Sequence, residues 1–145
     1  MVTEDIGAAN GVLLSPDERT LYVSDTPTEY LVAFDVRPDG SIGNKRNFAR
    51  LEGAQRTGAD GLAVDAAGRL YVASPVGVQV FSPQGQHLGT IPTPRPATSL
   101  AFAGPDKKTL YIVGRGTAGP RGAEQNARSM YKVSMLAQGY KDRAK

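Results

Sequence analysis

The sequence predicts an all-β fold, a β-propeller of about three four-stranded antiparallel blades. Two observations carry this prediction. Apolar and polar residues alternate along many short segments that are separated by Gly- and Pro-containing turns, which is the period-2 pattern of sheets. One such unit also recurs, and its equivalent residues Tyr22, Tyr71 and Tyr111 are 49 and 40 residues apart. Periods of about 40 to 50 residues with several strands per unit are typical of propeller blades.

The clearest copy of the unit is the segment 59–74, which predicts a strand, a tight turn and a second strand. Asp65 and Gly68 bracket the turn, because Asp bonds its own backbone and Gly accepts a left-handed conformation. Related segments lie upstream at 9–25 and downstream at 98–113. The recurrence makes this hairpin the inner half of each blade.

The predicted domain, residues 1–145, divides into blades at about 9–51, 59–92 and 97–134, followed by a C-terminal tail at 135–145. The predicted strands are Val12–Ser15, Leu21–Ser24, Tyr30–Val36, Lys45–Arg50, Leu62–Asp65, Leu70–Ala73, Val78–Phe81, His87–Ile91, Leu100–Ala103, Leu110–Val113 and Met130–Ser134. The tail shows no clear fourth strand for the last blade. The one helical turn considered lies at 123–128, and the Pro-rich segment 92–96 is an extended linker.

Three polar residues occupy equivalent places at the start of the innermost strands, namely Asn10, Asp60 and Ser99. Blades are related by rotation about a central axis, so side chains at one repeat position converge on one place. The three residues would then surround one point on the axis. The alternative is that they only cap turns, as Asn, Asp and Ser often do.

The composition, with 40% hydrophobic and 21% charged residues in a chain of 145, is that of one globular domain. Cys is absent, which excludes disulfides and thiolate metal sites. The first five residues lack the features of a signal peptide, so the chain as given is expected to be cytoplasmic, although its compartment is not determined. No apolar run is long enough to span a membrane.

The charge is uneven, with nine Lys or Arg against three Asp or Glu from Asp106 onward. A basic end can attract anions, but no nucleic-acid-binding motif accompanies it, so we expect a solvated surface and no nucleic-acid partner. The glycines at 114, 116 and 119 match a dinucleotide fingerprint only formally, because no helix pattern follows them. His87 is the only histidine, which argues against a Ser-His-Asp triad and a His-rich zinc site.

Oxygen ligands remain as candidates for chemistry. Asn10 and Asp60 offer an amide and a carboxylate, donors that suit hard cations such as Ca²⁺, Mg²⁺ or Mn²⁺. A metal-bound carboxylate can also act as a general base toward water. Because calcium takes six to eight oxygens, at least one further carboxylate is expected.

Three stretches of the sequence resemble the gluconolactonase/regucalcin (senescence marker protein) family, and bacterial gluconolactonases in particular. They are Ala9-Asn10-Gly11 with Ser15-Pro16-Asp17 and Leu21-Tyr22-Val23-Ser24-Asp25, then Ala59-Asp60-Gly61-Leu62-Ala63-Val64-Asp65 with Gly68-Arg69-Leu70-Tyr71-Val72-Ala73, and finally Ser99-Leu100-Ala101-Phe102 with Lys108-Thr109-Leu110-Tyr111-Ile112. The resemblance covers nearly the whole chain but only the C-terminal half of the family pattern. It implies half of a six-bladed propeller.

The family resemblance implies a hydrolase that opens sugar lactones with one divalent metal ion on the propeller axis. Ca²⁺ is the first candidate for this ion, with Zn²⁺, Mg²⁺ or Mn²⁺ as alternatives. Asn10 and Asp60 would be metal ligands, and Asp60 would also be the general base. Ser99 and Arg115 would contact the substrate, and the 114–128 loop would lie near the mouth of the site. The family's third ligand, a Glu of its first blade, is expected outside this chain.

Two other functions stay open. The chain could be a non-catalytic half-propeller that binds a divalent metal or serves as a scaffold, or an unrelated propeller-repeat interaction protein. Three blades also expose two blade faces, which we expect to be lined by residues such as Leu13, Leu21, Phe34, Phe102 and Tyr111. A homodimer or other self-association that closes the ring is therefore expected.

Overall fold

A computed structural model describes residues 6–53, 58–115 and 128–141 and contains eleven β-strands in these ranges. The strands are β1 (Ala9–Leu14), β2 (Thr20–Asp25), β3 (Tyr30–Val36), β4 (Ile42–Arg50), β5 (Leu62–Val64), β6 (Leu70–Ser74), β7 (Gly77–Phe81), β8 (His87–Ile91), β9 (Ala97–Ala103), β10 (Thr109–Arg115) and β11 (Arg128–Ser134). The described ranges hold no helix, and hence none long and apolar enough to cross a membrane.

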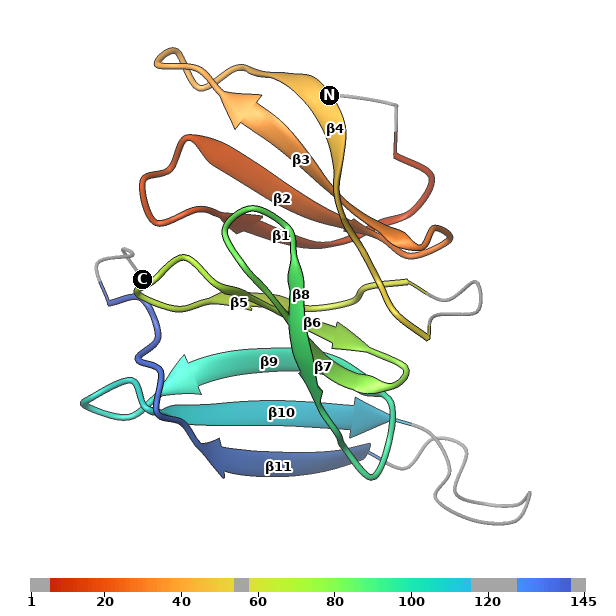
Figure 1. Cartoon of the computed structure of the whole chain (residues 1–145), viewed down its shortest axis with the longest axis vertical. Coiled ribbons are helices and arrows are strands. Elements are labelled where there is room, and N and C mark those ends of the chain that lie inside the picture. The colour runs from red at the N-terminus through yellow and green to blue at the C-terminus, as the bar shows by residue number, and fades with distance from the viewer. Residues whose placement is uncertain (1–5, 54–57, 116–127, 142–145) are drawn as a thin grey trace.

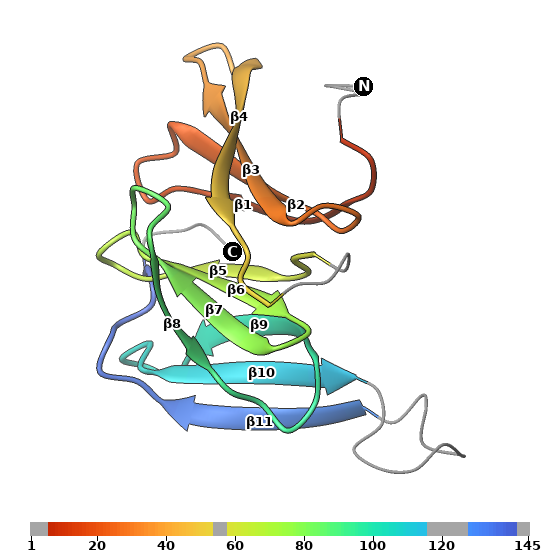
Figure 2. The ribbon, with the colours of Figure 1, turned by 45° about the vertical axis from the view of Figure 1, so that its right-hand side comes forward.

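The strands form three antiparallel sheets that are stacked in chain order, as Figures 1 and 2 show. The first sheet has the order β1-β2-β3-β4, the second β5-β6-β7-β8, and the third β9-β10-β11. Each sheet is a meander in which consecutive strands pair, which is the arrangement of propeller blades. The predicted all-β propeller fold is confirmed. The third sheet has three strands within the described residues, as expected from the sequence, which shows no clear fourth strand for this blade.

The core lies between neighbouring sheets, in two apolar clusters. The alternation of side chains along each strand sends one set to the sheet before and the other to the sheet after. The buried members between the first and second sheets include Tyr22, Leu31, Ala33, Leu70, Val72 and Phe81, and those between the second and third include Tyr71, Ala73, Val78, Leu100, Leu110 and Ile112. The second sheet is therefore covered on both faces.

The expected lining of the two open blade faces needs correction for two residues, Leu13 and Phe102, which pack toward the second sheet. Leu13 packs into the cluster between the first and second sheets, and Phe102 lies edge-on to a ring of the second sheet. Phe34 is only 3% exposed, and Leu21 packs beside it in a small cluster on the first sheet. Tyr111 alone is exposed, at 38%. The sequence pattern does not say which face of a strand meets the neighbouring sheet, and self-association stays a prediction.

The described part of the C-terminal tail, residues 135–141, packs against the sheets. It returns across the third sheet to the second, as Figure 1 shows in blue. Met135 N–H donates to the Lys108 carbonyl, and Tyr140 N–H donates to the Val64 carbonyl at the end of β5. Gly139 forms an isolated bridge with Asp65 and lies so close to Phe102 that a side chain would collide with the ring. The two sheets are thereby joined.

Asp65 is fully buried in the turn between β5 and β6, where four donors surround its carboxylate. Oδ1 accepts hydrogen bonds from the Ala67 and Arg69 N–H groups at 2.9 and 3.0 Å. Oδ2 accepts from Arg69 Nε at 2.6 Å and from the Tyr71 hydroxyl at 3.1 Å. Burial, together with the charge of Asp65, raises the pKa of Tyr71 to about 12. The hairpin therefore depends on a buried charge that is fully paired.

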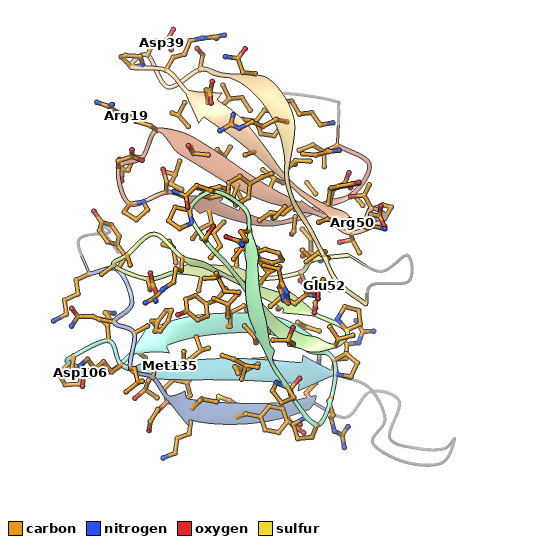
Figure 3. All side chains as sticks on the ribbon, viewed as in Figure 1. Arg19, Asp39, Arg50, Glu52, Asp106 and Met135 are labelled. Atoms are coloured by element: carbon orange, nitrogen blue, oxygen red, sulfur yellow. The ribbon has the colours of Figure 1, made fainter. Side chains whose placement is uncertain are left out.

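We expect Asp65→Ala to lower the free energy of unfolding by about 3 kcal/mol, because it leaves buried donors and a guanidinium without their acceptor. Tyr71→Phe removes one hydrogen bond and should cost about 1 kcal/mol. Asp39→Ala is the control, because Asp39 lies in the exposed turn between β3 and β4 (Figure 3). Urea denaturation measures all three, and an Asp65→Ala loss no larger than the Asp39→Ala loss would contradict the assignment.

Candidate functional site

The innermost strands β1, β5 and β9 lie side by side and bring the repeated polar positions together. Glycines allow the close approach. A side chain on Gly11 would collide with the Asp60 carbonyl oxygen, and one on Gly61 would come within 2.9 Å of the Ser99 Cα. The Gly61 N–H also donates to the Thr98 carbonyl at 3.0 Å. The backbone of each inner strand thus touches the backbone of the next one directly beside a candidate side chain.

Asn10 and Asp60 meet at this place. Burial raises the pKa of Asp60 above that of an ordinary aspartate, while a side-chain hydrogen bond from Asn10 and the charge of Arg115 act in the opposite direction. The three side chains come from the first, second and third sheets, although they are far apart in the sequence. A carboxylate with a raised pKa is a stronger base than an exposed one.

The remaining predicted residues lie around this pair. Arg115 ends β10, is exposed, and is held through its N–H, which donates to the Pro96 carbonyl at 2.9 Å. Ser99 is exposed in β9, and its backbone packs against Gly61. Asp60 therefore interacts with Asn10 and with the charge of Arg115, and Ser99 lies beside Gly61, the residue that follows Asp60.

Two residues that the sequence did not single out hold the pair in place. The Ser24 hydroxyl accepts a hydrogen bond from the Gly11 N–H at 2.5 Å and donates to the Asp60 carbonyl at 2.8 Å, so it joins two blades. Asn10 Nδ2 donates to the Thr26 hydroxyl at 3.3 Å. The repeat could have indicated Ser24, because this polar residue aligns with the apolar Ala73 of the second copy.

The donor chemistry at this place fits a hard divalent cation. Asn10 offers an amide oxygen and Asp60 a carboxylate, whereas the described ranges contain no group of three or more His, Cys, Asp or Glu side chains that could hold a metal ion. Calcium takes six to eight oxygen ligands. Asn10 and Asp60 therefore suit part of a cation site, and the other ligands have to be water, backbone or residues from elsewhere.

A comparison with known proteins identifies the family. The family model of the SMP-30/gluconolactonase/LRE-like region matches residues 1–115. The chain belongs to this family. It is 40% identical over 114 residues to a 6-deoxy-6-sulfogluconolactonase from Pseudomonas putida, and the match covers 74% of this chain and 38% of that protein.

Solved structures of the family agree with this assignment. The chain is 41% identical to a gluconolactonase from Xanthomonas campestris, with a TM-score of 0.69 over 77% of this chain and 36% of that one. A luciferin-regenerating enzyme is 28% identical, with a TM-score of 0.78 over 94% of this chain and 48% of that one. The chain thus spans between about a third and a half of the length of these SMP-30/gluconolactonase relatives.

Part of the predicted mouth of the site lies outside the described residues. The 114–128 loop is described only at its ends, where Gly114 and Arg115 complete β10 and Arg128 begins β11. The helical turn considered at 123–128 and the glycines at 116 and 119 fall in the undescribed part. His87 lies in β8 with its Nδ1 3.2 Å from a Glu52 carboxylate oxygen.

We expect Gly11→Ala to lower the free energy of unfolding by about 1 to 3 kcal/mol, because the new methyl group collides with the backbone of the neighbouring blade. Gly7→Ala is the matched control, since its methyl group would meet only ordinary contacts at 3.5 Å or more. Urea denaturation compares the two variants. Equal stability would show that the inner strands do not need this close approach.

Proposed function

We propose that this chain contributes the axial end of a metal-dependent, gluconolactonase-like lactonase that hydrolyses sugar lactones. The observation that carries the proposal is the approach of Asn10 and Asp60 from two different blades, with Arg115 of a third close enough for its charge to oppose the burial that raises the pKa of Asp60. Membership of the SMP-30/gluconolactonase family supports the substrate class. Relatives named for lactone hydrolysis support the same class.

Asp60 has the properties of the general base. Hydrolysis of a lactone adds a water oxygen to the carbonyl carbon, breaks the ring C–O bond, and gives a hydroxy acid. Asp60 accepts a proton from the attacking water, and the ring oxygen gains a proton as it leaves. Its half-buried carboxylate is a stronger base than an exposed aspartate because burial raises its pKa.

Asn10, Arg115 and Ser99 take the supporting roles. Asn10 and Asp60 would hold one divalent ion, with Ca²⁺ as the first candidate and Mg²⁺, Mn²⁺ or Zn²⁺ as alternatives. When bound, such an ion polarises the lactone carbonyl and lowers the pKa of water. The guanidinium of Arg115 attracts the electron-rich carbonyl oxygen of the lactone, and the exposed Ser99 hydroxyl can bond a sugar hydroxyl.

The second candidate is a non-catalytic half-propeller that binds a divalent metal. The observation in its favour is the small number of donors, since Asn10 and Asp60 alone supply fewer oxygens than a calcium ion takes. The two candidates share the cation site and differ only in turnover.

Hydrolysis of glucono-δ-lactone, followed in a pH-stat with added Ca²⁺ and again with EDTA, separates the two candidates. We expect turnover above the protein-free rate that EDTA abolishes. Asp60→Asn should lower the rate by about 100-fold or more, because it removes the base. Asp39→Asn, in the exposed β3–β4 turn, should leave the rate unchanged. Metal binding without any turnover would favour the non-catalytic half-propeller.

Calorimetric titration with Ca²⁺ or Mn²⁺ tests the two ligands directly. We expect Asp60→Ala to weaken binding more than Asn10→Ala does, because a carboxylate brings a full negative charge to a hard cation and an amide only a dipole. Circular dichroism of both variants checks that they are folded. If both bind the metal as well as the parent chain, neither residue is a ligand.

A further inference from the structure

A cleft lies between the first and second sheets, at the end of the inner hairpins that is remote from Asn10 and Asp60. Its volume is about 400 Å³. The β1–β2, β5–β6 and β7–β8 turns lie on this side of the stack, as Figures 1 and 2 show. Both sheets have four strands, so the cleft does not stand in for an absent strand. The lining residues come from these three turns and from β2, and they are Ser15, Pro16, Asp17, Thr20, Tyr22, Ala66, Ala67, Gly68 and Pro83.

Tyr22 lines this cleft, and its hydroxyl has no hydrogen-bond partner among the described residues. The residue is only 5% exposed. Its counterpart in the second sheet, Tyr71, donates a hydrogen bond to Asp65 at 3.1 Å. The first sheet has Ser15 directly after its inner strand, where the second sheet has Asp65, so the matching carboxylate is absent. A buried hydroxyl without a partner is unfavourable, and a ligand that bonds Tyr22 therefore gains free energy.

Asp17 brings a negative charge to the same cleft. Its Oδ1 accepts hydrogen bonds from the Ser15 hydroxyl at 2.6 Å and from the Arg19 N–H at 3.2 Å, and these bonds lower the pKa of Asp17. The residue is exposed, so its second oxygen, Oδ2, is accessible to a ligand. Burial, followed by the charge of Asp17, raises the pKa of Tyr22, while the charge of Arg46 acts in the opposite direction. At neutral pH an ionised carboxylate and a neutral hydroxyl therefore share the cleft.

The rest of the lining offers hydrogen-bond acceptors and small apolar surfaces. The N–H groups of Ala66, Ala67 and Gly68 already donate within the protein, and Pro16 and Pro83 have no N–H group. No Lys or Arg is among the described residues that line the cleft. A ligand therefore meets one negative charge and several acceptors beside methyl and ring carbon atoms. This combination suits a cation that is rich in donors and carries a short apolar chain.

We propose that this cleft binds a small primary amine in its ammonium form, between the Asp17 carboxylate and the Tyr22 hydroxyl. An ammonium group has three N–H donors and no acceptor, so it donates to both residues at once. The Thr20 hydroxyl is a further acceptor, and the alkyl chain lies on Pro16 and Pro83. A metal ion fits less well, because Asp17 is the only carboxylate among the described lining residues. The site is separate from the candidate lactonase site and does not depend on that function.

An NMR titration of the whole ¹⁵N-labelled chain with butylammonium chloride tests the proposal. We expect the amides of Asp17, Thr20 and Gly68 to shift together, with a dissociation constant of about 1 to 10 mM, as for a small ligand with one charged contact. Butyltrimethylammonium has the charge without N–H donors, and butanol has a donor without the charge. Each should bind about fivefold or more weakly. Equal binding of all three compounds would overturn the proposal.

Two substitutions separate this site from a general effect of charge. Asp17→Asn keeps an oxygen acceptor for the turn but removes the negative charge, and it should weaken butylammonium binding about fivefold or more. Asp39→Asn is the matched control, because Asp39 accepts similar turn bonds from the Ser41 N–H and hydroxyl at 2.9 and 2.7 Å but does not line the cleft. Its binding should equal that of the parent chain. Equal affinities of the two variants would show that Asp17 is not part of a site.

Tyr22→Phe removes the hydroxyl alone. Because this hydroxyl has no partner among the described residues, the urea midpoint of the variant should equal that of the parent chain, whereas Tyr71→Phe should lower it. The affinity of Tyr22→Phe for butylammonium should fall about threefold or more. A lower urea midpoint with unchanged affinity would show that the hydroxyl serves folding and not the ligand, and the assignment would be wrong.

Discussion

The close approach of neighbouring inner strands is the constraint on which the rest of the structure depends. Gly11 and Gly61 each place a residue without a side chain against the backbone of the next blade. Each glycine directly follows a candidate ligand, so the spacing between blades and the placement of Asn10 and Asp60 are set by the same contact. Ser24 adds a hydrogen bond to the Asp60 carbonyl and fixes the first contact further. A larger residue at either glycine would separate the blades and the site together.

A second constraint acts at the opposite ends of the same hairpins. Asp17, Asp65 and Asp106 each accept a hydrogen bond from the N–H group two residues later, between the first and second strands of a sheet. The repeated Asp thus closes each inner hairpin, and only in the second copy is it fully buried and paired with Arg69. The middle hairpin is covered on both faces, which explains why its carboxylate carries the most partners.

The sequence predicted those parts of the fold that are encoded locally. Alternation and turn residues indicated the eleven strands, and the repeat indicated that Asn10, Asp60 and Ser99 would converge. The parts that it did not predict depend on contacts between distant residues. The Asn10 side chain donates a hydrogen bond to the Thr26 hydroxyl in the connection between β2 and β3. The Tyr140 N–H donates to the Val64 carbonyl of β5, a strand of the second sheet that comes well before β11 in the chain. No local period records such contacts, because they depend on the finished packing.

The two interfaces between sheets differ in a way that bears on the site. The first is closed from the axis to its rim, since β4 and β8 both cover it, whereas the second is closed at the axis and hollow beside Leu88. The candidate ligands lie at the axial end, where glycine contacts and backbone hydrogen bonds hold the strands. The arrangement of Asn10 and Asp60 therefore rests on the inner strands and on the hydrogen bonds of Ser24 and Thr26, and not on the outer strands.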